Sequence, residues 1–228
     1  NSPEVELFKA NHLHPVHYFY HGLIARDWFR HWKHYNMAPG SESKRLGMYA
    51  RDASGSRAYR LDLIRKLIPF RDNLHFELQD PILKIDIDLG SYFDLSNTEY
   101  NSDSSATIVP EDCQKFDIQI VPETLFRTQK THLTEKVFKP IVMKQPFIIA
   151  GCPGSLDYLK SYGFKTFEHC WDESYDKETD SAKRMEMIID LVKDITSLSD
   201  KEYSYTMNAA RVVAEQNHKH FFLELTIT

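Results

Sequence analysis

The residues best suited to chemistry stand together at positions 134–136, where Thr134, Glu135 and Lys136 precede a largely apolar run. A Thr before a helix caps unpaired backbone N–H groups of the first turn. The positive end of the helix dipole then points outward, and Lys136 adds a full positive charge beside it. Glu135 supplies an acceptor for a hydroxyl group. The three residues predict a helix tip that binds a phosphate group beside a sugar or ribose hydroxyl, although an ordinary helix start with a surface ion pair has the same sequence.

A second polar group lies in the loop of residues 51–57, which contains two arginines, two serines and one glycine. Arg side chains pair bidentately with phosphate oxygens, and Gly lets backbone amides approach a ligand closely. A solvated, charged turn is the alternative interpretation. The predicted donor contacts from this loop are Arg51, Ser54, Ser56 and Arg57. Glu123, which follows an apolar run, is predicted to bind a ribose or sugar hydroxyl or else to be a solvated carboxylate.

Short apolar runs alternate with helical patterns from residue 46 onward, as in βαβ units. Strands are predicted over 46–50, 74–78, 116–121, 146–150 and 165–167, and helices over 57–68, 135–143, 154–162, 183–195 and 201–216. These elements predict an α/β fold built on a doubly wound parallel sheet. Ligands of such sheets bind outside the carboxyl ends of the strands, so the 51–57 loop, Glu123 and the helix tip are expected to meet there.

The segment Ile120-Val-Pro-Glu-Thr124 followed by Thr134-Glu135-Lys136 resembles the donor domain of the fucosyltransferases and related GT-B glycosyltransferases. In that family a strand ending in Phe-Glu-Asn-Ser is followed by a Thr-Glu-Lys helix and a strand ending in Gly, as at Gly151. Glu123 matches the Glu of this motif, whereas Pro and Thr replace Phe and Asn. The likeness covers residues 46–151, and a looser likeness to small viral and phage glycosyltransferases continues to residue 196.

This resemblance implies a Rossmann-like donor domain, a nucleotide-diphosphate sugar as co-substrate, no metal or other cofactor, and inversion at the sugar carbon. A basic residue at the first strand end contacts the donor phosphates in these families, which implies Arg51 or Arg57. Fucosyl transfer from GDP and xylosyl transfer from UDP both remain open. The acceptor is expected to be a glycan or a glycoprotein.

Residues 22–35 have apolar spacing typical of a helix. The resemblance implies that the region before residue 45 is a reduced, GT-B-like acceptor side. Inverting transfer needs a general base for the acceptor hydroxyl. Asp27 is the first candidate and His21 the second, although pairing of Asp27 with a neighbouring basic residue on a solvated face is the alternative. The predicted organisation is an acceptor-side segment over 1–44, the donor domain over 45–200 and a C-terminal helical segment over 201–228 that packs on the N-terminal part.

Two features suggest other chemistry. Asp86-Ile-Asp88 has the form of the metal-binding motif of the other large glycosyltransferase architecture, but its alternation with apolar residues also fits the wet face of an edge strand. Four N-terminal histidines raise the alternative of a zinc site, although their spacing fits no common ligand motif. They are His12, His14, His17 and His21. The alternatives to a metal-independent transferase are therefore an Asp-x-Asp transferase, a His-cluster hydrolase and a non-catalytic carbohydrate-binding module.

Composition limits the remaining classes. With 228 residues and 42% hydrophobic content the chain can bury a sizeable core. Its net charge of −5 argues against a nucleic-acid partner, so a phosphate ligand must be met by local positive charge. Three scattered cysteines give no disulfide framework and favour a reducing compartment. Because no apolar run is long enough to span a membrane, a cytoplasmic location is expected.

Overall fold

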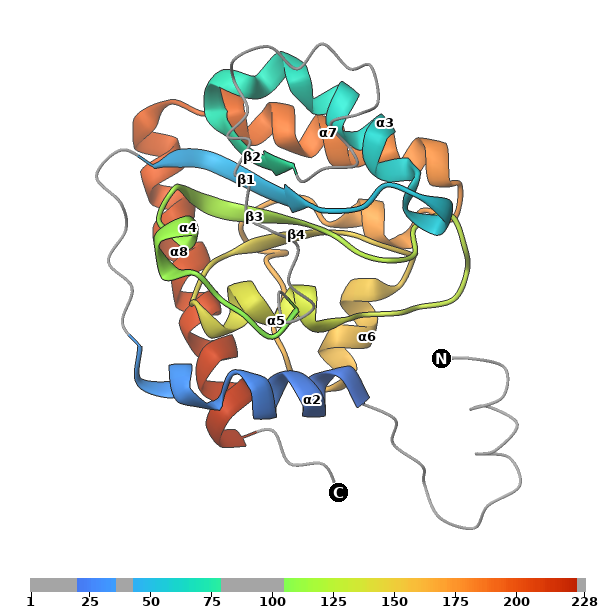
Figure 1. Ribbon diagram of the computed structural model, residues 1–228. Helices are drawn as coiled ribbons and strands as arrows, with labels where there is room; N and C mark the ends of the chain where they lie inside the picture. Colours follow the sequence, from blue (N-terminus) through green and yellow to red (C-terminus); the bar gives the residue numbers. More distant parts are fainter. Residues whose placement is uncertain (1–19, 36–42, 79–104, 225–228) are drawn as a thin grey trace.

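The computed structural model describes residues 20–35, 43–78 and 105–224. Four strands alternate with helices along this part of the chain (Figure 1). The strands are β1 (Lys44–Ala50), β2 (Leu74–Leu78), β3 (Phe116–Pro122) and β4 (Phe147–Ala150). The helices are α2 (Tyr20–Trp28), α3 (Tyr59–Leu67), α4 (Pro110–Cys113), α5 (Glu135–Val142), α6 (Ser155–Ser161), α7 (Ser181–Ser197) and α8 (Asp200–Lys219). Short 3₁₀ turns cover Arg30–His34, Gly55–Arg57, Ile68–Asn73 and Ser174–Lys177, and a π-helical turn covers His220–Glu224.

The four strands form one parallel sheet in the order β2-β1-β3-β4. From β1 the chain crosses to β2 on one side, and from β3 it crosses to β4 on the other, so the direction of winding changes between β1 and β3. The two crossover helices, α3 and α5, accordingly lie on opposite faces of the sheet (Figure 1). The α/β fold and the parallel sheet predicted from the sequence are confirmed, and the architecture is Rossmann-like. In sheets with such a change of direction, ligands bind in a crevice outside the carboxyl ends of the two central strands, which here are β1 and β3.

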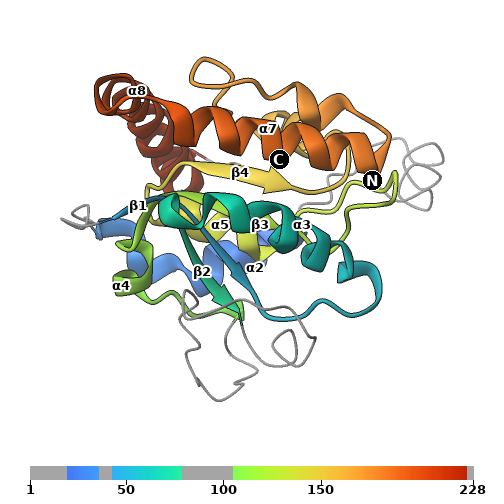
Figure 2. The same cartoon turned by 90° about the horizontal axis from the view of Figure 1, so that it is seen from above.

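The central strands are apolar because helices cover both of their faces. All four residues of β4 are buried, as are six of the seven of β3. Such continuous burial is typical of parallel sheets. Helices α3 and α7 pack together on one face, whereas α2 and α5 pack together on the other (Figures 1 and 2). The core thus fixes the strand ends from which the polar loops project.

One close approach in the sheet explains a glycine within β1. Gly47 lies against the ring of Phe116, and a Cβ at position 47 would come within 2.1 Å of Cδ1 of that ring. The ring also stacks on His75, with centroids 6.0 Å apart. A side chain at position 47 would therefore push β1 and β3 apart, and the glycine allows the two strands to pair.

The strand predicted over 165–167 is wrong. The backbone N–H of Lys165 donates to Oδ1 of Asn217 at 2.8 Å, and its carbonyl accepts from Nδ2 of Asn217 at 2.9 Å. The amide side chain of α8 thus takes both hydrogen bonds that a neighbouring strand would have made. The N–H of Phe167 likewise donates to Glu173. A period-2 pattern cannot reveal that a side chain replaces the strand partner.

The end of α8 lies against the N-terminal helical region. Nε2 of His218 lies 3.1 Å from the carbonyl of Lys33, and its Nδ1 lies 2.8 Å from the carbonyl of Val142 at the end of α5. Arg26 of α2 also donates to the carbonyl of Phe222. These contacts join the described part of the N-terminal segment to the body of the sheet domain. Within the described residues, no helix combines the length and apolar character needed to cross a membrane.

Candidate functional site

Arg51 follows β1 and Glu123 follows β3, so both border the place where a doubly wound sheet has its ligand crevice. The 124–134 segment then returns to this edge and begins α5. The sequence-predicted donor residues therefore come from three loops at one edge of the sheet. The structure brings these three loops together through buried side chains, not only through proximity of the strand ends.

Glu123 connects β3 to the start of α5. Its side chain is 0% exposed, and Oε1 accepts the backbone N–H of Thr134 at 3.1 Å. Oε2 accepts the hydroxyl of Thr134 at 2.8 Å and the N–H of Thr124 at 3.2 Å. We expected Glu123 to bind a ribose or to be solvated, but the structure encloses the carboxylate and engages both of its oxygens. Its role is to hold the start of α5 against the end of β3.

Thr134 caps α5 as predicted. Its Oγ1 accepts the backbone N–H of Lys136, and Nζ of Lys136 lies 2.8 Å from the same oxygen. That ammonium group also contacts Oγ1 of Thr124 at 3.3 Å and Oε1 of Glu135 at 3.5 Å. Burial alone would raise the pKa of Glu135, but the charge of Lys136, the N–H of Glu135 and the charge of Lys139 together hold the pKa below its ordinary value. Glu135 and Lys136 therefore form an ion pair at the start of α5.

Lys139 is a functional candidate that the sequence analysis did not identify. It lies one turn after Lys136 on α5, and burial lowers its pKa to about 8. The charges of Lys136 and Arg51 act in the same direction as burial within this total shift, whereas Glu135 and Cys113 oppose it. Lys136 and Arg51 are thus close enough to Lys139 to influence its pKa. The only sequence signal was the spacing of three residues between two lysines, which ordinary amphipathic helices also show.

The two arginines in the loop after β1, Arg51 and Arg57, have different roles. Arg57 pairs with Asp52 at 2.8 Å, and the N–H of Ser54 donates to the same carboxylate at 2.8 Å. Partial burial would raise the pKa of Asp52, but these bonds hold it below its ordinary value. Ser54 and Ser56 are exposed. Of the two predicted phosphate ligands in this loop, Arg51 is the one whose charge acts on Lys139 of α5, whereas Arg57 stabilises the loop.

Arg60 ties two of these loops together, and the sequence analysis missed it. It is 3% exposed, and its Nη1 donates to the carbonyl of Asp52 at 2.8 Å. Its Nη2 donates to the carbonyls of Pro122 and Glu123 at 2.7 and 3.1 Å. The neighbouring Tyr59 hydroxyl lies 2.6 Å from the Glu123 carbonyl and 3.0 Å from that of Ala150. The start of α3 thus positions the carboxyl ends of β1, β3 and β4.

Arg184 of α7 fixes the other side of the same edge. Its guanidinium lies over the ring of Phe126 and donates to the carbonyls of Phe126 and Gly151. A further bond reaches the carbonyl of Glu178 at 2.6 Å. These acceptors are backbone groups of the loops that follow β3, β4 and α6. Charged residues that look like ligand-binding candidates in the sequence therefore serve as internal supports.

The acidic segment 171–176 caps backbone groups. Asp172 accepts the N–H of Ser174 at 2.9 Å, and Glu173 accepts that of Phe167 at 2.8 Å. Asp176 accepts the N–H of Leu156 in the first turn of α6 at 3.0 Å. Burial raises the pKa of Asp176 to about 6. The segment supports the loop after β4.

The two predicted general bases lie in different surroundings on α2. The side chain of Asp27 is 73% exposed and pairs with Arg30 at 2.6 Å, which is the solvated pairing that the sequence left open. The ring of His21 instead meets that of His132 edge-on, with centroids 4.9 Å apart. His132 lies just before the Thr134 cap. The structure therefore brings His21, and not Asp27, into contact with the segment that leads into α5.

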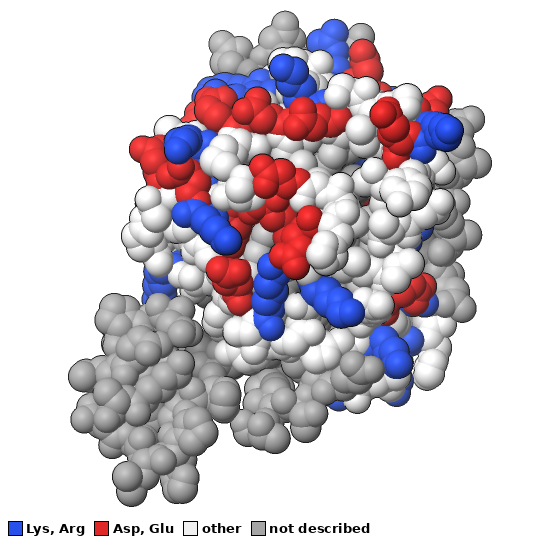
Figure 3. Space-filling model, turned by 180° about the vertical axis from the view of Figure 1, so that it is seen from behind, with Lys and Arg blue, Asp and Glu red and all other residues white. Residues whose placement is uncertain are grey.

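Metal-binding alternatives find no support within the described ranges, where no group of three His, Cys, Asp or Glu side chains is arranged to hold an ion. Asp86, Asp88, His12, His14 and His17 lie outside those ranges. In the described part of the face shown in Figure 3, acidic and basic side chains are interspersed. A phosphate ligand would therefore depend on the local charges at the crevice.

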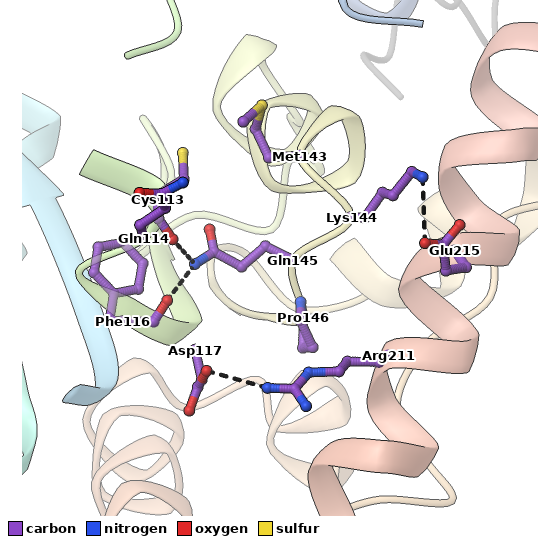
Figure 4. A pocket seen from close by; sticks show the side chains of 10 residues that line it. All are labelled: Cys113, Gln114, Phe116, Asp117, Met143, Lys144, Gln145, Pro146, Arg211 and Glu215. Atoms are coloured by element: carbon purple, nitrogen blue, oxygen red, sulfur yellow. Dashed lines mark hydrogen bonds and ion pairs between the residues drawn. The ribbon is translucent and has the colours of Figure 1, made fainter. Parts of the chain in front are cut away.

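A cavity of about 160 Å³ lies at the opposite, amino edge of the sheet (Figure 4). The end of α5, the start of β3 and α8 border it. Its charged groups are paired with one another, Arg211 with Asp117 at 3.4 Å and Lys144 with Glu215 at 3.3 Å. Because these charges balance and the cavity lies away from the carboxyl ends of the strands, we assign the functional site to the crevice instead.

Comparison of the chain with protein-family models, with curated proteins and with solved structures gave no match. The case for a function therefore rests on the residues and geometry of the crevice.

Proposed function

We propose that this protein is a glycosyltransferase that binds a nucleotide-diphosphate sugar in the crevice outside β1 and β3. In this proposal Arg51, Lys136 and Lys139 bind the diphosphate. Glu135 accepts a hydroxyl of the ribose or the sugar. The observation that carries the proposal is the electrostatic effect of Arg51 and Lys136 on Lys139, next to the capped start of α5, in a protein whose net charge is −5.

The proposed reaction needs stabilisation of a leaving group. When the anomeric carbon loses its bond to the diphosphate, negative charge develops on the departing phosphate oxygen. Cations and helix N–H groups that are already in place stabilise that charge without further reorganisation. The buried bonds of Glu123 and Arg60 hold the helix start and the strand ends in position. The chain thus offers a preorganised anion site, which supports transfer without a metal as the proposed mechanism.

The acceptor in this proposal is a glycan or a glycoprotein, approaching from the side of α2 in a GT-B-like arrangement. Helix α2 packs on α5 and reaches the carboxyl edge at His21. The donor base and sugar are left to experiment, with GDP-fucose and UDP-xylose as the first compounds to test. Inversion follows if the acceptor oxygen attacks from the side opposite the diphosphate.

Thermal unfolding in the presence of different nucleotides tests the proposal. A ligand that binds only the folded state at 100 times its dissociation constant adds about 2.7 kcal/mol of stability. We expect GDP or UDP, and the corresponding sugar nucleotide, to raise Tm, whereas the free nucleosides should have little effect. Equal Tm values with every diphosphate and with buffer alone would contradict the proposed function.

A further inference from the structure

The proposed function requires a group that accepts the proton of the acceptor hydroxyl, and the sequence offered Asp27 and His21 for it. The structure separates the two. Asp27 projects into solvent and contacts Arg30. A base in that position is fully hydrated and already neutralised by a guanidinium group, whereas His21 touches His132.

His132 occupies the boundary between the anion-binding helix and α2. It precedes the cap of α5 by two residues, and its imidazole is partly buried. The edge-on contact with His21, at 4.9 Å between centroids, fixes one side of the ring. A group at this place can face both a donor held by Lys136 and an acceptor that approaches along α2.

We propose that His132 is the general base of the transfer reaction and that His21 positions it. This inference rests on the proposed function. In the reaction, Nδ1 or Nε2 of His132 takes the proton of the acceptor hydroxyl while the acceptor oxygen forms a bond to the anomeric carbon. The bond between that carbon and the phosphate oxygen breaks, and the nucleoside diphosphate leaves with the electron pair.

The charges around His132 support this role. Burial lowers its pKa first, followed by the positive charges of His21, Lys136 and Lys130, while Glu135 acts in the opposite direction. These groups come from α2, from the loop before α5 and from α5 itself. The imidazole is therefore held in its neutral form near pH 7, which is the form that can accept a proton.

Donor binding would strengthen the base. A diphosphate beside Lys136 adds negative charge close to His132, and an opposite charge at short range favours the protonated imidazole. The proton affinity of His132 then rises only once the donor is bound. Binding of the leaving group by the cations is thus coupled to the proton affinity of the neighbouring His132.

NMR titration of the histidines tests this coupling without any acceptor. His132 is assigned by comparison with His132→Gln, and inorganic pyrophosphate and then GDP or UDP serve as probes. We expect its pKa to lie below 6.5 in the free protein and to rise by roughly 1 unit when the nucleotide binds. A His132 pKa that stays unchanged in a nucleotide-saturated protein would overturn the inference.

Hydrolysis of the sugar nucleotide, with water as the acceptor, gives a second readout. His132→Gln should lower kcat by roughly 100-fold or more while leaving nucleotide affinity within a few-fold. His169→Gln, at an exposed loop position, is the matched control and should behave as wild type. His21→Gln should move the acidic limb of the kcat/KM profile to higher pH, because it removes a positive charge that lowers the His132 pKa.

The outcomes separate the two proposals. Full turnover by His132→Gln, with normal nucleotide binding, rejects His132 as the base but leaves the donor site standing. Failure of the wild-type protein to bind any nucleotide rejects the proposed function and this inference with it. Loss of turnover with retained binding and a shifted His21→Gln profile supports both.

Discussion

At the amino edge of the sheet, Arg211 and Lys144 each lie beside one carboxylate. At the carboxyl edge, the charges of Lys136 and Lys139 act on Glu135, and those of Lys136 and Arg51 act on Lys139. Both edges have arginine and lysine side chains, but the ratio of these cations to neighbouring carboxylates differs between the edges. Paired charges stabilise a surface weakly. Cations held near one another raise the free energy of the empty site, which an anionic ligand can relieve.

The two edges also differ in how buried the side chains are that stabilise them. Behind the carboxyl edge lie buried side chains whose bonds run to backbone groups, such as those of Arg60 and Glu123. The ion pairs of the amino edge are more exposed, with the Arg211 side chain 44% and the Glu215 side chain 60% accessible. Buried supports beneath several neighbouring cations thus distinguish the carboxyl edge, our proposed binding site, from the amino edge.

The largest expected difference between the two edges is the loss of unfolding free energy when Arg60 is replaced. Replacing it in Arg60→Met leaves the carbonyls of Asp52, Pro122 and Glu123 without this donor and should lower the free energy of unfolding by about 3 kcal/mol. Arg211→Met, at the amino edge, should cost less than about 1 kcal/mol. Urea denaturation measures both. Equal losses for the two variants would contradict the internal-support role of Arg60.

Glu123→Gln should have the next largest effect. The amide keeps the shape of the carboxylate but turns one acceptor into a donor, which faces the donors of Thr134 or Thr124. We expect a loss of about 2 kcal/mol in unfolding free energy and weaker nucleotide binding through a loosened start of α5. The matched change Glu215→Gln should alter neither quantity measurably. Wild-type stability of Glu123→Gln would show that the buried carboxylate does not hold the helix.

Lys139 and Lys144 are expected to differ in their effect on how stability depends on pH. Its folded-state pKa of about 8 is lower than the ordinary value of 10.5, so the unfolded chain binds more protons between these limits. This group therefore adds stability as pH rises from about 8 toward 10.5. Lys139→Met should remove that rise in stability and should increase Tm by a few degrees at pH 7. In a chain of this size, each kcal/mol of stability changes Tm by roughly 2–4 °C. Lys144→Met should keep the wild-type slope, and a slope unchanged by Lys139→Met would contradict the assignment.

A smaller effect is expected from Asp176, which supports the loop after β4. Burial raises its pKa from 3.8 to about 6, so its contribution to stability is complete below pH 4 and is lost as pH rises through 6. Asp176→Asn keeps an acceptor for the N–H of Leu156 and should flatten stability between pH 4 and 6. Thermal unfolding across this range measures the difference from wild type. A parallel pH dependence in the two proteins would reject the titration of Asp176.

The sequence predicted most of the fold because its local signals agree with the packing. Residues 74–78 form the strand that was expected, and α5 begins after the Thr134 cap as predicted. Apolar runs flanked by turn residues indicated the parallel sheet, since buried strands and amphipathic helices have different periods. The failure at Lys165 arose because Asn217 lies 52 positions away.

The candidate site was predictable only in part, for the same reason. Arg51 and the 134–136 segment carry local signals, a basic loop after a strand and a capped helix. The tasks of Glu123 and Arg60 depend on bonds between residues 11 and 62 positions apart, which no local pattern records. The meeting of His21 with His132 likewise depends on how α2 packs against α5.

Isothermal titration of pyrophosphate, GDP and UDP into matched double variants tests the central claim most directly. Arg51→Met/Lys136→Met removes two cations from the carboxyl edge, and Lys144→Met/Arg211→Met removes two from the amino edge. We predict that at least one nucleotide binds the wild-type protein and that the second variant binds it as wild type. The first variant should bind it at least about 100-fold more weakly, since each of its two lost charged hydrogen bonds costs about 1.5–3 kcal/mol. Equal affinity of the first variant and the wild type, or loss of binding only in the second, would contradict the account.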